Sequence, residues 1–180
     1  MKYEITDIAH PNNPKLFRIR ALIDIPSIGV KAGDLGGYVE SEHNLSHEGN
    51  CWVSANARVY GNAQVFGNAQ VYGDARVFEN AQVYDNAQVY DNACVFVNAQ
   101  VYGNAQVYEG ADVCEYAQVY GNAKVCGGAE VWGDARVYGH AQVCGNSFVT
   151  ANAHMNIKIN GVWDEAAYLE WFFTHERQTA

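Results

Sequence analysis

The side chains that could do chemistry in this 180-residue chain are a few histidines, cysteines and carboxylates. A histidine can act as a general base at neutral pH, and His140 and His154 are the two that fall within the regular part of the sequence. His140, in VYGHAQ, takes a turn position that Asn fills in most repeats, so a tolerated polar residue is the simpler interpretation. We therefore predict no catalytic residue and keep His140 and His154 as candidates only.

Metal ligands are also sparse along the chain. His43 and His47 lie four residues apart, and a surface loop explains them without a zinc ion. Asp91 and Glu109 are eighteen residues apart, but two carboxylates make a poor cage for a cation such as calcium, which takes six or more oxygen ligands. The sequence therefore predicts no metal site. It also predicts no nucleotide cofactor, because no glycine-rich loop precedes a helix.

The five cysteines do not form a recognisable framework. Cys51, Cys94, Cys114, Cys126 and Cys144 are odd in number and lack CxxC spacing, which argues against a secreted disulfide scaffold and against a zinc site. Cys126 and Cys144 could approach closely if residues eighteen apart stack. In a reducing compartment, however, we expect free thiols.

A repeat of six residues must position these groups. Every sixth residue from Val53 to Val149 is Val, and the fourth residue after each is Ala except at Ser147. Pairs such as Gly-Asn and Gly-Asp lie between them, and these residues tolerate the positive φ of tight turns. Each hexapeptide is therefore a short strand and a corner. Such strands persist only when stacked, so the period indicates a parallel β-helix.

The motif Val-x-x-x-Ala-x resembles the hexapeptide of the left-handed β-helix superfamily. That resemblance implies an all-β fold, a left-handed, triangular parallel β-helix with three hexapeptides in each eighteen-residue coil. The handedness rests on the resemblance, because ordinary parallel crossovers are right-handed. The segments GDLGGYVE and NLSHEGN, which lead into the repeats, resemble the opening of YdcK-like bacterial and prophage hexapeptide-repeat proteins. This second resemblance covers about residues 16 to 154.

The two ends of the chain differ from the repeat. We expect residues 1–34 to form an N-terminal capping β-hairpin, residues 35–154 the β-helix, and residues 155–180 a strand followed by an α-helix. Three weaker hexapeptides from residue 35 should keep the phase through Val39, Leu45 and Cys51. The C-terminal helix would pack through its apolar residues, which with the preceding strand are Trp163, Leu169, Trp171, Phe172 and Phe173.

Residues on either side of each Val should point outward and sort by eighteen into three faces. Two faces are regular ladders of Gln and Tyr, and we expect stacked rings along the solenoid axis there. The third face has few glutamines and an apolar strip that a monomer would rarely expose. Superfamily members usually form parallel trimers, so we predict that this face is a homotrimer interface, formed by Tyr60, Phe78, Phe96, Cys114, Trp132, Phe148, Arg58 and Arg76.

Net charge and hydrophobic patterning limit the kinds of partner that the chain could bind. The formal net charge is −9, and direct nucleic-acid binding needs clustered Lys and Arg, so we expect none. The chain has neither a run of 18 apolar residues nor a basic segment leading into an apolar one. We therefore expect no membrane contact and a cytoplasmic location.

The function we favour is a non-catalytic, trimeric β-helical scaffold of phage or prophage type that binds a host protein through its surface. It could inhibit a host-defence complex or sequester a nucleotide signal. One alternative is an acyl- or acetyltransferase that uses acetyl-CoA with His140 or His154 as base, although no loop interrupts the hexapeptides from residue 53 to 154. Another is an acidic mimic of nucleic acid, which ranks last because the carboxylates are spread over different corners.

Overall fold

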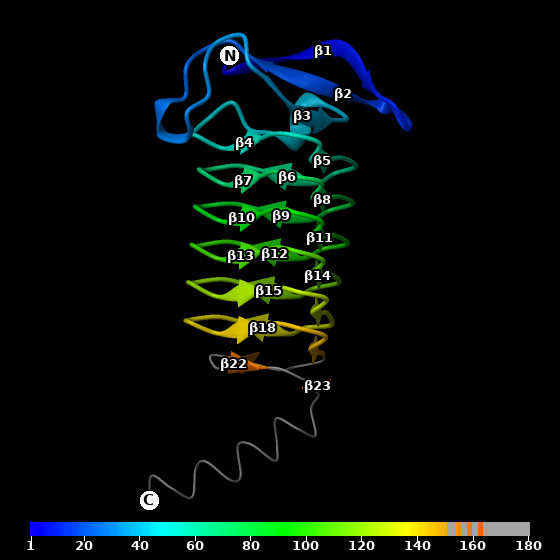
Figure 1. Ribbon diagram of the computed structural model, residues 1–180, viewed down its shortest axis with the longest axis vertical. Helices are drawn as coiled ribbons and strands as arrows, with labels where there is room; N and C mark the ends of the chain where they lie inside the picture. The colour runs from blue at the N-terminus through cyan, green and yellow to red at the C-terminus, as the bar shows by residue number, and fades with distance from the viewer. Residues whose placement is uncertain (151–153, 156–157, 160–161, 164–180) are drawn as a thin grey trace, which may run out of the picture.

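The protein is a parallel β-solenoid in which short coils stack along one axis, as the computed structural model shows in Figure 1. The structure describes residues 1–150 with their side chains and the backbone of residues 154–155, 158–159 and 162–163. Parallel strands pair with strands eighteen residues further along, so Val59 lies beside Val77 and Val77 beside Val95. The predicted β-helix is thereby confirmed as a parallel β-solenoid with eighteen-residue coils.

The strands form three sheets. The first sheet has ten strands, in the order β1 (Tyr3–His10), β2 (Asn13–Ala21), β3 (Leu35–Val39), β5 (Arg58–Val59), β8 (Arg76–Val77), β11 (Cys94–Val95), β14 (Asp112–Val113), β17 (Glu130–Val131), β20 (Phe148–Val149) and β23 (Val162–Trp163). The second sheet has seven, namely β4 (Trp52–Val53), β7 (Gln70–Val71), β10 (Gln88–Val89), β13 (Gln106–Val107), β16 (Lys124–Val125), β19 (Gln142–Val143) and β22 (Lys158–Ile159). The third has six, namely β6 (Gln64–Val65), β9 (Gln82–Val83), β12 (Gln100–Val101), β15 (Gln118–Val119), β18 (Arg136–Val137) and β21 (His154–Met155).

The core is a column of valine and alanine. From Val53 to Val149 every repeat Val is at most 1% exposed, and from Ala57 to Ala141 every repeat Ala is fully buried. Each coil therefore adds the same six small side chains to the interior, and each contacts those of the coils on either side. The branched Val fits the pleated strand, and the small Ala that follows each corner is buried beside it.

The corners hold their shape through positive φ and through bonds between coils. Gly occupies most of the left-handed positions, but Asp and Glu also adopt them, as in Asp85 at φ 57°. The carboxylate of Asp85 accepts the N–H of Gly103 at 3.1 Å, and the carboxylate of Glu115 accepts the N–H of Gly133 at 3.0 Å. An acidic residue at a corner thus satisfies an amide of the next coil, which offsets its backbone strain.

The first coil departs from the predicted phase. Cys51 occupies an alanine position, because it lies two residues before Val53 as Ala69 lies two residues before Val71, and Val53 pairs with Val71. Val39, however, pairs with Val59 and Leu45 with Val65, so both lie twenty residues from their partners. The prediction that these two residues continue the six-residue phase is therefore wrong. Two extra residues enter between Leu45 and Val53, beyond the short 3-10 helix η2 (Glu42–Asn44).

A β-hairpin extends the first sheet at the N-terminal end. Strands β1 and β2 pair antiparallel, and β2 pairs antiparallel with β3, so the hairpin lies above the first coil (Figure 1). The Lys2 amine donates to the Cys51 carbonyl at 2.8 Å and the Tyr3 hydroxyl to the Leu45 carbonyl at 2.7 Å. A 3-10 helix, η1 (Pro26–Ile28), lies in the connection to β3. The hydrogen bonds of Lys2 and Tyr3 tie the hairpin to the coil beneath it.

At the other end, the strand predicted near residue 158 is present as β22. The helix predicted beyond Asp164 lies outside the described residues, as do Leu169, Trp171, Phe172 and Phe173. Trp163 ends β23. Across the described part of the chain, no helix has the length and apolar character needed to cross a membrane.

Candidate functional site

The predicted interface residues come together on the outer side of the first sheet, which we call the first-sheet face. It consists of two columns that run along the solenoid axis on either side of the buried valines. One column precedes the valines and the other follows them, and the register of strands β5 to β20 aligns each column from coil to coil. The preceding column is Arg58, Arg76, Cys94, Asp112, Glu130 and Phe148, and the following column is Tyr60, Phe78, Phe96, Cys114, Trp132 and Thr150.

The following column is mostly apolar. The Tyr60 and Phe78 rings stack with their centroids 5.2 Å apart, and the Phe78 and Phe96 rings stack at 5.0 Å. Cys114 interrupts the stack as a half-buried free thiol, and burial together with nearby carboxylates raises its pKa to about 11. Trp132 then leaves 38% of its surface exposed. The column therefore presents a continuous apolar strip that is only partly covered.

The preceding column separates opposite charges along the axis. Arg58 and Arg76 lie toward the N-terminal end, Asp112 and Glu130 toward the C-terminal end, and Cys94 lies between the two pairs. Within residues 1–150 the ion pairs are Arg20 with Glu4 and Lys31 with Asp24, so none of these four charges is paired with an opposite one.

Arg58 and Arg76 meet different surroundings. Nε of Arg58 is buried and lacks a hydrogen-bond partner among the described residues. The Arg76 guanidinium donates to Sγ of Cys94 at 3.0 Å. Burial raises the pKa of the Cys94 thiol, and the nearby Arg76 charge acts in the opposite direction. A buried donor without an acceptor is costly, so the Arg58 Nε carries a desolvation penalty that no bond within the described residues offsets.

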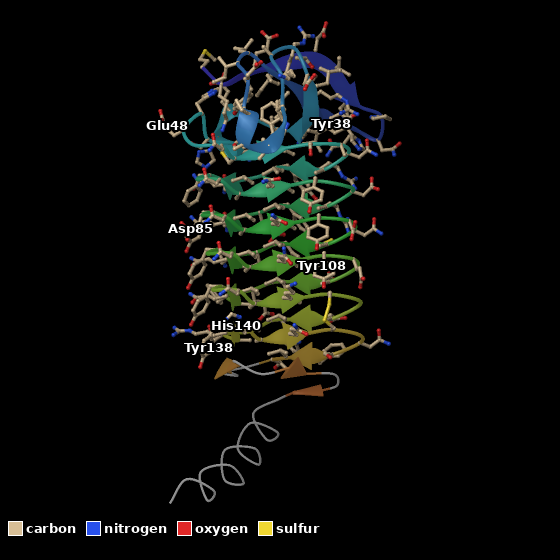
Figure 2. The ribbon with its side chains drawn as sticks, turned by 60° about the vertical axis from the view of Figure 1, so that its left-hand side comes forward. Tyr38, Glu48, Asp85, Tyr108, Tyr138 and His140 are labelled. Atoms are coloured by element: carbon tan, nitrogen blue, oxygen red, sulfur yellow. A yellow bond between two sulfur atoms is a disulfide. The ribbon has the colours of Figure 1, made fainter. Side chains whose placement is uncertain are left out.

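The other two faces carry the predicted aromatic ladders, which are confirmed. On the third sheet, Tyr84, Tyr102 and Tyr120 stack at centroid separations of 4.9 Å. On the second sheet, Tyr90 stacks on Tyr108 at 4.9 Å, and the disulfide continues that column (Figure 2). These faces therefore stack aromatic rings on aromatic rings from coil to coil over most of their length.

The two catalytic candidates lie on different elements. His140 is exposed at the corner that follows β18, where it continues a column of hydrogen-bonded asparagines from Asn68 to Asn122, and Figure 2 shows it beside Tyr138. His154 begins β21, where Arg136 is its neighbour in the register. The described residues contain no group of three His, Cys, Asp or Glu side chains that could hold a metal ion.

The other groups considered from sequence have local partners. His43 contacts the Gln64 amide at 2.9 Å, and Nδ1 of His47 accepts the Lys2 N–H at 3.2 Å. Asp91 accepts the Glu109 N–H at 3.4 Å, so this carboxylate bonds to the backbone of the next corner. These contacts give each group a structural role in the turns and the first coil.

Cys126 and Cys144 form a disulfide, so the expectation of free thiols is wrong for this pair. Their Cα atoms are 4.6 Å apart because residues eighteen apart lie on neighbouring strands. Stacking of identical residues in consecutive coils therefore places two cysteines within bonding distance. Cys51, Cys94 and Cys114 are free.

The six-residue repeat does not predict the hollow at the N-terminal end of the first-sheet face. The tip of the hairpin reaches over the N-terminal end of the face, where His10 packs edge-on against Tyr38 with centroids 4.7 Å apart. A hollow of about 320 Å³ opens there between the tip and the coils, lined by His10, Pro11, Asn12, Tyr38, Asn56, Arg58 and Asp74. Burial and the Arg58 and Arg18 charges lower the pKa of His10. The hollow leaves space beside Arg58.

Comparison with protein families supports the reading of the repeat. A family model described as YdcK Beta solenoid repeat matches residues 69–85, which include β7, β8 and β9. The repeat, the solenoid and this match fit a YdcK-like hexapeptide-repeat protein. No curated protein matches the chain. This match describes the repeat that builds the solenoid and not what the surface of the solenoid binds.

Proposed function

We propose that the protein is a non-catalytic solenoid scaffold that acts by binding, and that the first-sheet face is its contact surface for another copy of the chain. The observation that carries the proposal is the contrast between the three faces. Two of them stack tyrosine rings along the axis beside columns that are mostly glutamine, whereas the first-sheet face combines an apolar strip with two positive and two negative charges that form no ion pair among the described residues. Such a surface gains more from being covered than the other two do.

The coil geometry is part of the same proposal. Three sheets, hexapeptide strands and corners of positive φ agree with the superfamily pattern, and that resemblance supports a left-handed, triangular coil. The outer faces of such a coil are flat enough to pack against one another. A face built on rigid stacked strands also needs little rearrangement on binding, which lowers the entropic cost of association.

The mass of the protein in solution tests this function. The monomer has a mass of 19.8 kDa, so light scattering after gel filtration should show a multiple of that value for the wild-type chain. Phe96→Asp and Trp132→Glu each place a charge in the apolar strip and should return the chain to its monomer mass. Tyr102→Asp is the matched control, because Tyr102 has the same position in its hexapeptide on the third-sheet ladder.

The outcomes separate cleanly. Loss of assembly in Phe96→Asp but not in Tyr102→Asp supports the proposed contact surface. A wild-type monomer at all accessible concentrations, or mutants of the strip that still assemble, would refute it. Circular dichroism should show the same strand signal for all four proteins, so a change in mass is not caused by unfolding.

A further inference from the structure

We propose that two copies pack through their first-sheet faces as an antiparallel homodimer, with a two-fold axis that runs along the strand direction at β11. The inference rests on the proposed function and specifies its partner. It follows from the order of side chains in the preceding column. Reading outward from Cys94, that column has Arg76 and then Arg58 in one direction, and Asp112 and then Glu130 in the other.

The symmetry fixes which residues meet. A two-fold axis along the strands, lying between two facing sheets, keeps each position along a strand and reverses the order of the coils. The preceding column therefore faces the preceding column of the partner, and the following column faces the following column. With the axis at Cys94, the opposed levels are Cys94 with Cys94, Arg76 with Asp112, and Arg58 with Glu130.

The charges are complementary in this arrangement. Arg76 lies opposite Asp112 of the partner subunit, and Arg58 lies opposite Glu130 of the partner subunit. The two-fold axis repeats both pairs, so all four unpaired charges of each copy acquire an opposite charge. Glu130 of the partner subunit also places a carboxylate beside the Arg58 guanidinium, which lines the hollow at this end of the face. The hollow beside Arg58 leaves room for that carboxylate.

The apolar column is matched by the same operation. Phe96 faces its own copy, Phe78 faces Cys114 of the partner subunit, and Tyr60 faces Trp132 of the partner subunit. Each contact buries apolar surface against apolar surface, including the exposed part of Trp132. Neither column places a charge against an aromatic ring at the same position. One symmetry axis therefore satisfies both columns.

A parallel assembly does not satisfy the charges. In a parallel dimer or trimer the symmetry axis runs along the solenoid, so residues of the same coil meet. This axis also reverses the position along the strands, so the preceding column of one copy faces the following column of another. Arg58 and Arg76 then lie against Tyr60 and Phe78 of the neighbouring copy, and Asp112 and Glu130 lie against its Cys114 and Trp132, so none of the four charges meets an opposite one. We therefore infer the antiparallel dimer in place of the parallel trimer that the superfamily resemblance implies.

Charge reversal distinguishes the two arrangements. Sedimentation equilibrium should show that Arg58→Glu weakens dimerisation by at least about 100-fold, because the two-fold axis creates two like-charge contacts. Glu130→Arg should weaken it similarly. The double variant Arg58→Glu/Glu130→Arg should recover most of the wild-type affinity, because a positive charge again faces a negative charge in each of these contacts. Arg136→Glu, an exposed charge on the third sheet, is the matched control and should have no effect.

A parallel assembly predicts a different pattern. There the side chain at position 58 lies against Tyr60 of the partner subunit, so Arg58→Glu creates no like-charge contact, and the double variant restores no charge pair. That result in an assembling wild-type protein would overturn the antiparallel inference while leaving the proposed function intact. A monomeric wild-type protein would instead overturn both, so the two failures are distinguishable.

A distance measurement tests the orientation without changing the face. Spin labels can be attached through an unnatural amino acid at Asn98, in the coil of Phe96, or at the exposed corner residue Asp134, two coils away. In the antiparallel dimer the two labels at Asn98 lie at the same height. Those at Asp134 are separated along the axis by four strand spacings, roughly 19 Å. Equal label distances at the two positions would contradict the antiparallel arrangement.

Discussion

Removal of the disulfide between Cys126 and Cys144 should lower stability by an amount that the sequence separation sets. The bond closes a loop of eighteen residues in the unfolded chain. In the chain-entropy model a loop of this length corresponds to about 3 kcal/mol of stabilisation at 25 °C. For a chain of this size, that free energy corresponds to a decrease in Tm of roughly 6 to 12 °C.

The assay compares thermal unfolding with and without a phosphine reductant. The wild-type chain should lose stability when reduced, and Cys126→Ser/Cys144→Ser should match the reduced wild-type chain and not respond to reductant. The double variant retains Cys51, Cys94 and Cys114, so it also shows whether these free thiols contribute to any effect of the reductant on Tm. An unchanged Tm of the reduced wild-type chain would refute the reasoning. If the Tm decreases only for a separate transition at lower temperature, the C-terminal coils unfold independently of the others, which a solenoid allows because each coil contacts only its neighbours.

Two further predictions concern a corner and an aromatic ladder. Gly49→Ala should destabilise the chain by about 1 to 3 kcal/mol more than Gly29→Ala. Both residues have positive φ, but only at Gly49 would the added Cβ clash, against the carbonyl oxygen of Gly67. Urea unfolding measures the difference, and equal losses would contradict it. Burial and the neighbouring tyrosines raise the pKa of Tyr90 to about 12, so the neutral ring stabilises the fold below pH 10 and this contribution is lost as the pH rises through 12. Tyrosine absorbance and circular dichroism followed together should change in that window, and full ionisation near pH 10 with an intact strand signal would exclude the effect.

The candidate site was predictable where it depends on the period alone. A six-residue repeat with Val and Ala fixes the core, and the eighteen-residue coil then sorts the outward residues into faces. That reasoning placed Tyr60, Phe78, Phe96 and Trp132 on one surface and the tyrosine ladders on the others. A strict repeat makes such inference possible because each residue has the same local surroundings as its equivalents.

The irregular parts could not be predicted in the same way. The reach of the hairpin tip over Tyr38, the hollow beside Arg58 and the two extra residues of the first coil depend on contacts between segments distant in the sequence. The disulfide depends on whether Cys126 and Cys144 come within bonding distance. The prediction of free thiols considered only the redox state of the compartment and was wrong for this pair.

The sequence by itself determined the core, the coil length and the membership of each face, because period and burial are properties of the chain read in order. Only the tertiary structure decided which charges stay unpaired and which donor lacks an acceptor, because both depend on distances in space. Arg58 shows the difference most directly. The sequence places it on the first-sheet face, while the fold buries its Nε without an acceptor and leaves a hollow beside it.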